Sequence, residues 1–394
     1  MLRMVAMTTI LTASGPADLL GLIPTLAGFT PRESLVLLPF TGFRARGALR
    51  ADLPRNADVD LHEYAATLVG MTCRVPSVDG LAAVIYTDDE LDPDALPFAE
   101  VADITIAYAE SCGLRIVEVL CVGADSWANY LVTTPVLHDL AEIPDPPSVP
   151  GVVDIAADQA AGGELPTVDL AEKERVGQAL AAVDQMFTAL MPDGESAEGP
   201  VDGERPADAE SRLDPRAYLS ALALDDLPQF LEDLLDSPEN IDPFVTAALI
   251  WCLERPLLRD VALAQWATDL PTGDEVLAAQ LAFRGDISTF PPHLGDILLG
   301  QGPRPDADRL RLALTLARNA AARAPRASRV GALVASAWLS WALGRATHAD
   351  HYLRLAHEIT PEHTFAGMLR TIIDAGMLPA WAFSAAGAAE QPSP

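Results

Sequence analysis

Carboxylate and aromatic side chains gather after two predicted strands, where they could bind a ligand. One group follows the apolar run Leu81 to Tyr86, and the other follows the run Arg115 to Val122. The candidates are Asp88, Asp89, Asp125, Trp127 and Tyr130. Because hard cations take oxygen ligands, these residues could form a polar pocket with magnesium on the carboxylates. Acidic loops after strands are also ordinary in an acidic protein, so both interpretations stay open.

A second candidate group combines opposite charges. Arg50 and Asp52 are two residues apart in an alternating segment, so we expect them on one strand face, as an ion pair or facing a ligand. Asp18 lies at the start of a predicted helix, whose first N–H groups need acceptors. We expect a network among the three that either stabilises the fold or contacts a ligand.

The sequence lacks the common catalytic motifs. It contains no phosphate-binding Gly-x-x-x-x-Gly-Lys, no Gly-x-Gly-x-x-Gly after a strand, no Gly-x-Ser-x-Gly and no His-Glu-x-x-His. His348 and His351 share a predicted helix, but a metal site there would need a third ligand. The cysteines form no Cys-x-x-Cys pair, and we interpret them as buried, reduced thiols: Cys73, Cys112, Cys121 and Cys252. The catalytic residues and the cofactor therefore stay unknown, and no metal site is assigned.

Strand and helix signals alternate in residues 1–140. The signals predict helices at 15–28, 61–68 and 97–113, and strands at 34–40, 47–53, 81–86 and 115–122. This alternation predicts an α/β domain with a mostly parallel sheet and flanking helices, with Ser34 to Phe40 as an added antiparallel strand. Such sheets bind ligands at the carboxyl ends of their strands, which here carry residues 54–56, 87–90 and 123–130.

The remaining chain is predicted to be helical beyond a connector. Residues 141–190 read as a proline-rich connector followed by a helix at 170–190, 191–212 as an acidic disordered linker, 213–380 as a helical domain and 381–394 as a disordered tail. The helices are expected at 214–222, 225–236, 242–254, 256–268, 274–283, 306–323, 328–343, 347–359 and 362–376. Part of this half matches a tetratricopeptide template, at Val330, Leu333, Ala337, Gly344, Ala349, Leu353, Ala356 and Pro361. A generic helical bundle is the alternative.

Charge and hydropathy restrict the partners and the compartment. A formal net charge of −30, with no cluster of basic residues, disfavours nucleic acid and anionic membrane surfaces. Residues 1–20 lack the long apolar run of a signal peptide, and no stretch has the length of a membrane span. We therefore predict a cytoplasmic protein. Met1, Met4 and Met7 stay open as start residues.

Several of these segments resemble one known family. The opening Ser14 to Leu20, the strand segment Arg50 to Pro54, the pair Trp127 and Tyr130, and Gly163 to Pro166 are similar to motifs of the actinobacterial family catalogued as domain of unknown function 4192, DUF4192. The chain departs from that pattern after Tyr130, where relatives carry paired cysteines and a Pro-x-x-Gly. It also lacks the arginine expected shortly after Pro166. The resemblance implies a fold and no known reaction.

Two classes of function follow from these patterns. The leading hypothesis is a protein-interaction or ligand-sensing module, in which the helical half binds a protein or peptide and the α/β half senses a small ligand. The alternative is a metal-assisted hydrolase or nucleotide-binding enzyme that uses the carboxyl edge of the sheet. Convergence of Asp88, Asp89 and Asp125 opposite a basic group would favour the enzyme.

Overall fold

The computed structural model describes residues 13–147, 157–190, 213–283 and 291–383. The chain divides into two compact units, one built mainly on the residues up to Ala161 and the other on Gly162–Ala382. The predicted helix at 170–190 therefore belongs to the second unit. The predicted linker 191–212 and residues 384–394 of the predicted tail lie outside the described residues. Among the helices in the described ranges, none is both long enough and apolar enough to cross a membrane.

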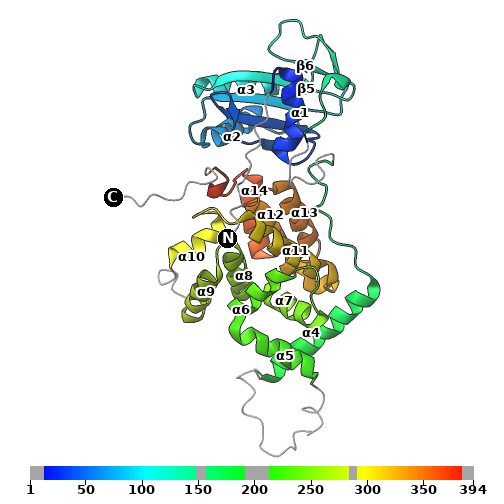
Figure 1. The fold of residues 1–394 in the computed structure, drawn as a ribbon, viewed down its shortest axis with the longest axis vertical. Helices are drawn as coiled ribbons and strands as arrows, with labels where there is room; N and C mark the ends of the chain where they lie inside the picture. Colours follow the sequence, from blue (N-terminus) through cyan, green and yellow to red (C-terminus); the bar gives the residue numbers. More distant parts are fainter. Residues whose placement is uncertain (1–12, 148–156, 191–212, 284–290, 384–394) are drawn as a thin grey trace, which may run out of the picture. The chain divides into compact units, whose positions relative to one another are not determined.

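The first unit contains a seven-stranded mixed sheet (Figure 1). Its strands are β1 (Ser34–Thr41), β2 (Arg44–Ala45), β3 (Leu49–Asp52), β4 (Gly80–Tyr86), β5 (Arg115–Val122), β6 (Ser126–Asn129) and β7 (His138–Asp139). They are ordered β2-β1-β4-β5-β6-β7, and β3 also pairs with β1. The four long strands predicted from the sequence are confirmed, and β2, β6 and β7 are additional short ones.

The prediction of a mostly parallel sheet is wrong. Among the strand pairs that the structure describes, β4 and β5 alone run parallel. β1 is antiparallel to β2, β3 and β4, which confirms it as an antiparallel strand. Parallel neighbours need a crossover of about a dozen residues or more, whereas residues 42–43 and 123–125 are links of hairpin length. The short links therefore determine two of the antiparallel pairs, β1 with β2 and β5 with β6.

Helices cover both faces of this sheet (Figure 1). The helix α1 (Pro16–Ala27) packs on the face to which Val36 points. The helices α2 (Leu61–Cys73) and α3 (Ala99–Ser111) pack on the opposite face, with Leu35. Since successive strand residues point to opposite faces, a strand that is buried on both reads as an unbroken apolar run.

The second unit is helical. It contains α4 (Leu170–Leu190), α5 (Pro215–Ala223), α6 (Leu227–Asp233), α7 (Pro243–Leu253), α8 (Pro256–Ala267), α9 (Leu270–Ala282), α10 (Pro292–Asp296), α11 (Ala307–Arg323), α12 (Val330–Ala342), α13 (Ala346–His357) and α14 (Thr364–Asp374). Every predicted helix is present with its ends shifted by a few residues, and α10 is additional. Gly344, at φ 77°, forms the turn between α12 and α13. Trp381, which lies in the predicted tail, is buried in the core of this unit.

The four cysteines are in two different environments. Cys121 and Cys252 are buried, and burial raises the pKa of their thiols to about 11 and about 12. Cys73 and Cys112 are exposed, so the prediction that all four are buried is wrong for this pair. Their thiols interact at the ends of α2 and α3, and burial together with Cys112 raises the pKa of Cys73. The packing of α2 on α3 joins two residues that are distant in the sequence.

Candidate functional site

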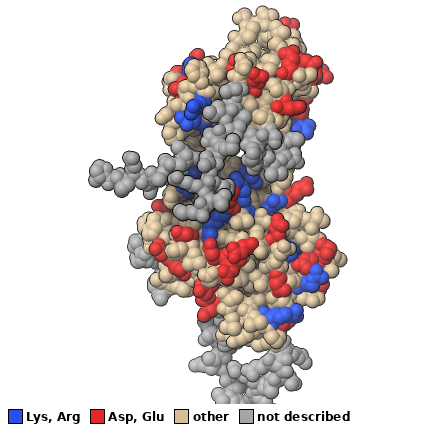
Figure 2. All heavy atoms as spheres, in the orientation of Figure 1, with Lys and Arg blue, Asp and Glu red and all other residues tan. Residues whose placement is uncertain are grey.

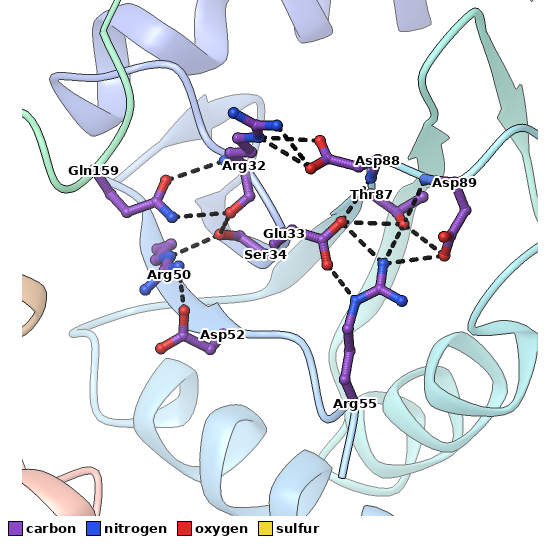
Figure 3. A network of polar contacts seen from close by, with 10 residues as sticks. All are labelled: Arg32, Glu33, Ser34, Arg50, Asp52, Arg55, Thr87, Asp88, Asp89 and Gln159. Carbon is purple, nitrogen blue, oxygen red and sulfur yellow. Dashed lines mark hydrogen bonds and ion pairs between the residues drawn. The ribbon is translucent and has the colours of Figure 1, made fainter.

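The candidate site lies at the edge of the sheet where β1 begins and where β3 and β4 end (Figure 3). Ser34 pairs in register with Asp52 on one side and with Tyr86 on the other. We name the ten residues drawn in Figure 3 the arginine–carboxylate network: Arg32, Glu33, Ser34, Arg50, Asp52, Arg55, Thr87, Asp88, Asp89 and Gln159. The edge thus unites charged residues from segments that are far apart in the chain.

Arg55 is at the centre of the arginine–carboxylate network. Its guanidinium group forms an ion pair with Glu33 through two nitrogens. It also donates to the Thr87 hydroxyl at 2.9 Å and to the Asp89 carboxylate at 3.0 Å. The centre of the Phe98 ring lies 5.2 Å from the guanidinium carbon, within the range of a cation–π contact. Arg55 therefore connects the end of β3 to the beginning of β1, the end of β4 and the beginning of α3.

Two neighbours of Arg55 have an unfavourable backbone conformation. Glu33 has φ 47° and Phe98 has φ 55°, in the left-handed region that L residues adopt at a cost. The Glu33 carboxylate also accepts the Asp88 N–H at 2.6 Å and the Thr87 hydroxyl at 3.4 Å, which compensates part of that cost. Strained residues of this kind concentrate at functional sites, so the two outliers support a function for this edge.

Arg32 and Asp88 form an ion pair of the network in which both side chains are more than half exposed. The two side chains are 62% and 53% exposed, and Arg32 donates to the carboxylate through Nε at 3.1 Å and Nη2 at 2.9 Å. The Gln159 side chain accepts the Arg32 N–H at 3.1 Å and donates to the Arg32 carbonyl at 2.9 Å. The backbone of Arg32 is therefore fixed, while its charged end is open to solvent.

The predicted association of Asp18, Arg50 and Asp52 is present for the last two. Arg50 pairs with Asp52 and donates to the Ser34 hydroxyl through Nε at 2.7 Å. Its side chain is only 11% exposed, whereas that of Asp52 is 82% exposed. Asp18 lies in the first turn of α1, and its carboxylate accepts the N–H of Ser14, which precedes the helix, at 2.9 Å. Among the described residues, no side chain caps the first residues of α1, so the expected cap by Asp18 is not present.

We expect Arg50→Ala to lower the free energy of unfolding by about 1–3 kcal/mol, because it removes a mostly buried guanidinium group together with its hydrogen bond to the Ser34 hydroxyl and its ion pair with Asp52. Urea unfolding of the full chain measures this change. Arg44→Ala, at an exposed position on β2, is the matched control and should change stability by less than about 0.5 kcal/mol. Unchanged stability together with a loss of binding would instead identify Arg50 as a ligand residue.

The pKa values of Glu33, Arg32 and Arg55 are each shifted in the direction that favours the charged form. The hydrogen bond from Arg55 lowers the pKa of Glu33 against the opposing effect of burial. The hydrogen bond to Asp88 raises the pKa of Arg32, and the hydrogen bond to Glu33 raises that of Arg55. These groups therefore remain ionised across the physiological pH range.

Trp127 and Tyr130 pack on opposite faces of the sheet, so the structure does not bring these two candidate residues together. Trp127 is 4% exposed, packs on the α1 face and stacks on His138 with ring centres 4.2 Å apart. Tyr130 packs on the opposite face and donates its hydroxyl to the Pro97 carbonyl. Because strand residues alternate, two positions that are three apart point in opposite directions.

The three aspartates of the predicted metal pocket have separate partners. Asp88 pairs with Arg32, Asp89 pairs with Arg55, and Asp125 accepts the hydroxyl of the adjacent Ser126 at 2.9 Å. Within the part of the chain that the structure describes, no three His, Cys, Asp or Glu residues are arranged to hold a metal ion. The predicted strand ends are adjacent, but Asp88 and Asp89 contact arginines of the protein itself, and Asp125 contacts a hydroxyl group.

The sequence-based prediction missed six of the ten residues of the network. The residues not singled out are Arg32, Glu33, Ser34, Arg55, Thr87 and Gln159. Arg55 and Thr87 fall inside the strand-end segments 54–56 and 87–90, so including the basic and hydroxyl side chains of these segments among the candidates would have found them. Arg32 and Glu33 precede β1, and only its antiparallel direction brings them to this edge.

Comparison with known proteins identifies a family and no characterised relative. A family model described as "Domain of unknown function (DUF4192)" matches residues 16–286 and 303–380, which is most of the chain and includes nearly all of both units. No curated protein and no solved structure matches the chain.

Proposed function

Because this chain belongs to the DUF4192 family, whose description assigns no activity, we propose its function from the site: it is a binding protein without a catalytic step, and its α/β unit senses a small charged ligand at the arginine–carboxylate network. The network is open to solvent at Arg32 and Asp88 and fixed by hydrogen bonds at Glu33. A sensor requires an exposed recognition group on a rigid support, and this edge has both.

One observation supports binding over catalysis: the resolved pKa shifts in the network move away from neutrality. The pKa of Glu33 is lowered and those of Arg32 and Arg55 are raised, in each case by their mutual hydrogen bonds or by Asp88. A general acid or base works best with a pKa near the operating pH, so these shifts are opposite to those that catalysis needs. Thr87 is also a poor nucleophile, since it is only 4% exposed.

The ligand class follows from the exposed Arg32–Asp88 pair. A ligand that carries only one charge would leave Arg32 or Asp88 without a partner. A zwitterion with a carboxylate and an ammonium group replaces both partners at once, with the carboxylate on Arg32 and the ammonium on Asp88. We therefore propose an α-amino acid or a compound with the same pair of groups.

We propose that the helical unit binds a partner protein or peptide in response to the ligand of the α/β unit. The α12–α13 hairpin with its glycine turn supports a tetratricopeptide-like arrangement, and such helical hairpins present surfaces to proteins or peptides. Its partner is therefore a protein or peptide, and the net charge of −30 argues against nucleic acid. A cytoplasmic location and an actinobacterial origin are part of the same proposal and rest on the sequence alone.

The enzyme hypothesis is the weaker alternative. A metal-assisted hydrolase or a nucleotide-binding enzyme at this edge would use Asp88, Asp89 and Asp125 together. Two of these carboxylates face arginines, and the third faces a hydroxyl. An enzyme of this kind would have to break two ion pairs before it could bind a metal ion there.

We expect Arg32→Gln and Asp88→Asn to abolish amino-acid binding while changing the free energy of unfolding by less than about 1 kcal/mol, because exposed ion pairs contribute little to stability. Isothermal titration of the full chain with a panel of α-amino acids and dipeptides measures binding, and urea unfolding measures stability. Arg115→Gln is the matched control, because Arg115 forms a similarly exposed pair with Asp79.

Three results would contradict the proposal. Binding of no member of the panel would exclude the proposed ligand class. Equal binding by the Arg32, Asp88 and Arg115 variants would place the site elsewhere. Conversion of a bound panel member into a product would move the protein into the enzyme class.

A further inference from the structure

A group of arginines on the helical unit has too few acidic partners. Arg311 and Arg318 are two turns apart on α11, and Arg345 is the residue just before α13. The helix α12 packs against both α11 and α13, so the three helices lie side by side (Figure 1). Burial and then the positive charges of Arg311 and Arg318 lower the pKa of Arg345, which agrees with the packing of these helices.

Tyr352 lies in the same place with an unsatisfied hydroxyl. Its side chain is fully buried at 0% exposure, and its hydroxyl group has no hydrogen-bond partner. Burial raises the pKa of Tyr352, and the positive charges of Arg318 and Arg345 oppose that rise. Buried polar groups in folded proteins are nearly always hydrogen-bonded, and each exception calls for an explanation such as an absent ion or ligand.

Arg318 is also incompletely satisfied. Its Nη2 donates to the Glu164 main-chain carbonyl, but its buried Nε has no hydrogen-bond partner. No carboxylate pairs with Arg318 within the described ranges, although other arginines of this unit do find one. A guanidinium group held by one neutral carbonyl oxygen retains most of its capacity to bind an anion.

The position of Arg345 is unfavourable without an anion. A cation at a helix N-terminus is repelled by the positive end of the helix dipole, and no side chain caps α13. Partial burial and the charges of Arg311 and Arg318 lower the pKa of Arg345. Among the residues that the structure describes, Arg345 forms no ion pair, whereas Arg311 pairs with Asp308.

The nearby acidic side chains do not neutralise the positive charges of Arg318 and Arg345. Asp350 is shared by Arg354 at 2.9 Å and Arg370 at 3.4 Å. The Glu164 carboxylate acts on His351, whose pKa is lowered mainly by burial, and Glu164 offers Arg318 only its main chain. Acidic side chains are plentiful on this protein, whose net charge is −30 and whose surface carries them widely (Figure 2). The lack of a partner is therefore local to this group.

We propose that Arg318, Arg345 and Tyr352 form a binding site for a tetrahedral oxyanion of the phosphate type. Two guanidinium groups, a hydroxyl and the uncapped N-terminus of α13 supply more donors than the two oxygens of a carboxylate can accept. Three or four oxygens and a double negative charge fit this set of donors. The anion is free phosphate or the phosphate group of a small monoester, since both present the same oxygens. The site is in the helical unit and is independent of the proposed sensor in the α/β unit.

The test is a titration of the full chain with inorganic phosphate, against sodium chloride at matched ionic strength. We expect phosphate to bind once per chain and to raise the melting temperature, because a ligand that binds only the folded state stabilises it. Arg318→Gln and Arg345→Gln should each weaken phosphate binding about tenfold or more, as the loss of a charge-assisted hydrogen bond does. Glycerol phosphate in a second titration distinguishes the two sources: tighter binding than inorganic phosphate identifies a monoester as the ligand.

Two controls separate an anion site from a structural role. Arg354→Gln, on the same helix and paired with Asp350, should leave phosphate affinity within about twofold. In phosphate-free buffer, Tyr352→Phe and Arg345→Gln should melt no lower than the unchanged protein, because they remove an unsatisfied group and a repelled charge. The proposal is overturned if phosphate and chloride give the same melting temperature, or if Arg354→Gln weakens binding as much as Arg345→Gln does.

Discussion

Gly331→Ala is expected to destabilise the helical unit by about 3 kcal/mol, near the upper end of the range for overpacked cores. Gly331 lies in the first turn of α12, where that helix crosses the end of α7. A Cβ atom at this position would lie 2.7 Å from the Glu254 nitrogen and closer still to the carbonyl group of Leu253. Both contacts are with main-chain atoms, which cannot rotate away as a side chain could. Urea unfolding of the full chain measures the loss.

Gly367→Ala is the matched control for this prediction. Gly367 is also inside a helix, α14, and a Cβ there would meet no atom within 4 Å. Alanine is a better helix former than glycine by about 1 kcal/mol, so this substitution should leave stability unchanged or raise it. A similar change in stability for both variants would show that helix propensity dominates and that the α7–α12 crossing can relax.

Most of the secondary structure could be predicted from the sequence, because each element depends on local signals. The strand β5 (Arg115–Val122) has the predicted bounds, and α4 (Leu170–Leu190) does as well. The strand β5 is a run of mostly apolar residues, and α4 has apolar residues at helical spacing, so the sequence marks the ends of both. The missed elements β2, β6 and β7 have two to four residues each, too few to show a period. A short strand of this kind is defined by its partner rather than by its own residues.

The order of the strands could not be predicted, because it depends on pairing. The rule that alternating strands and helices give parallel sheets holds here for β4 and β5, which are joined through α3. The apolar residues of β1 are compatible with either direction. The strand β1 pairs with β3 and β4 and runs antiparallel to both. Its first residues therefore lie beside the ends of β3 and β4, which brings Arg32 and Glu33 to the candidate site. For the same reason, the sequence alone does not place Arg32 opposite Asp88.

We expect Trp127→Ala to lower the free energy of unfolding by about 3–5 kcal/mol, the usual cost of truncating a large buried aromatic residue. Trp127 is 4% exposed and lies between the α1 face of the sheet and the ring of His138, so it closes the end of the sheet against solvent. Its indole nitrogen is buried without a hydrogen-bond partner. Trp127→Phe retains most of the packing and removes that nitrogen, so it should cost much less, about 1 kcal/mol.

Fluorescence distinguishes this role from a ligand-binding one. The difference between the emission spectra of the unchanged chain and of Trp127→Phe isolates the signal of this side chain, which should be that of a buried indole. If Trp127 closes the core, neither magnesium nor a nucleotide should alter the difference spectrum, because no ligand reaches a ring that is covered by α1 and His138. A saturable change on addition of either probe, lost in Asp125→Asn, would show that the end of the sheet opens to a ligand. In that case the carboxylates after β4 and β5 would have to leave their present partners to bind it, and the enzyme hypothesis would replace the sensor.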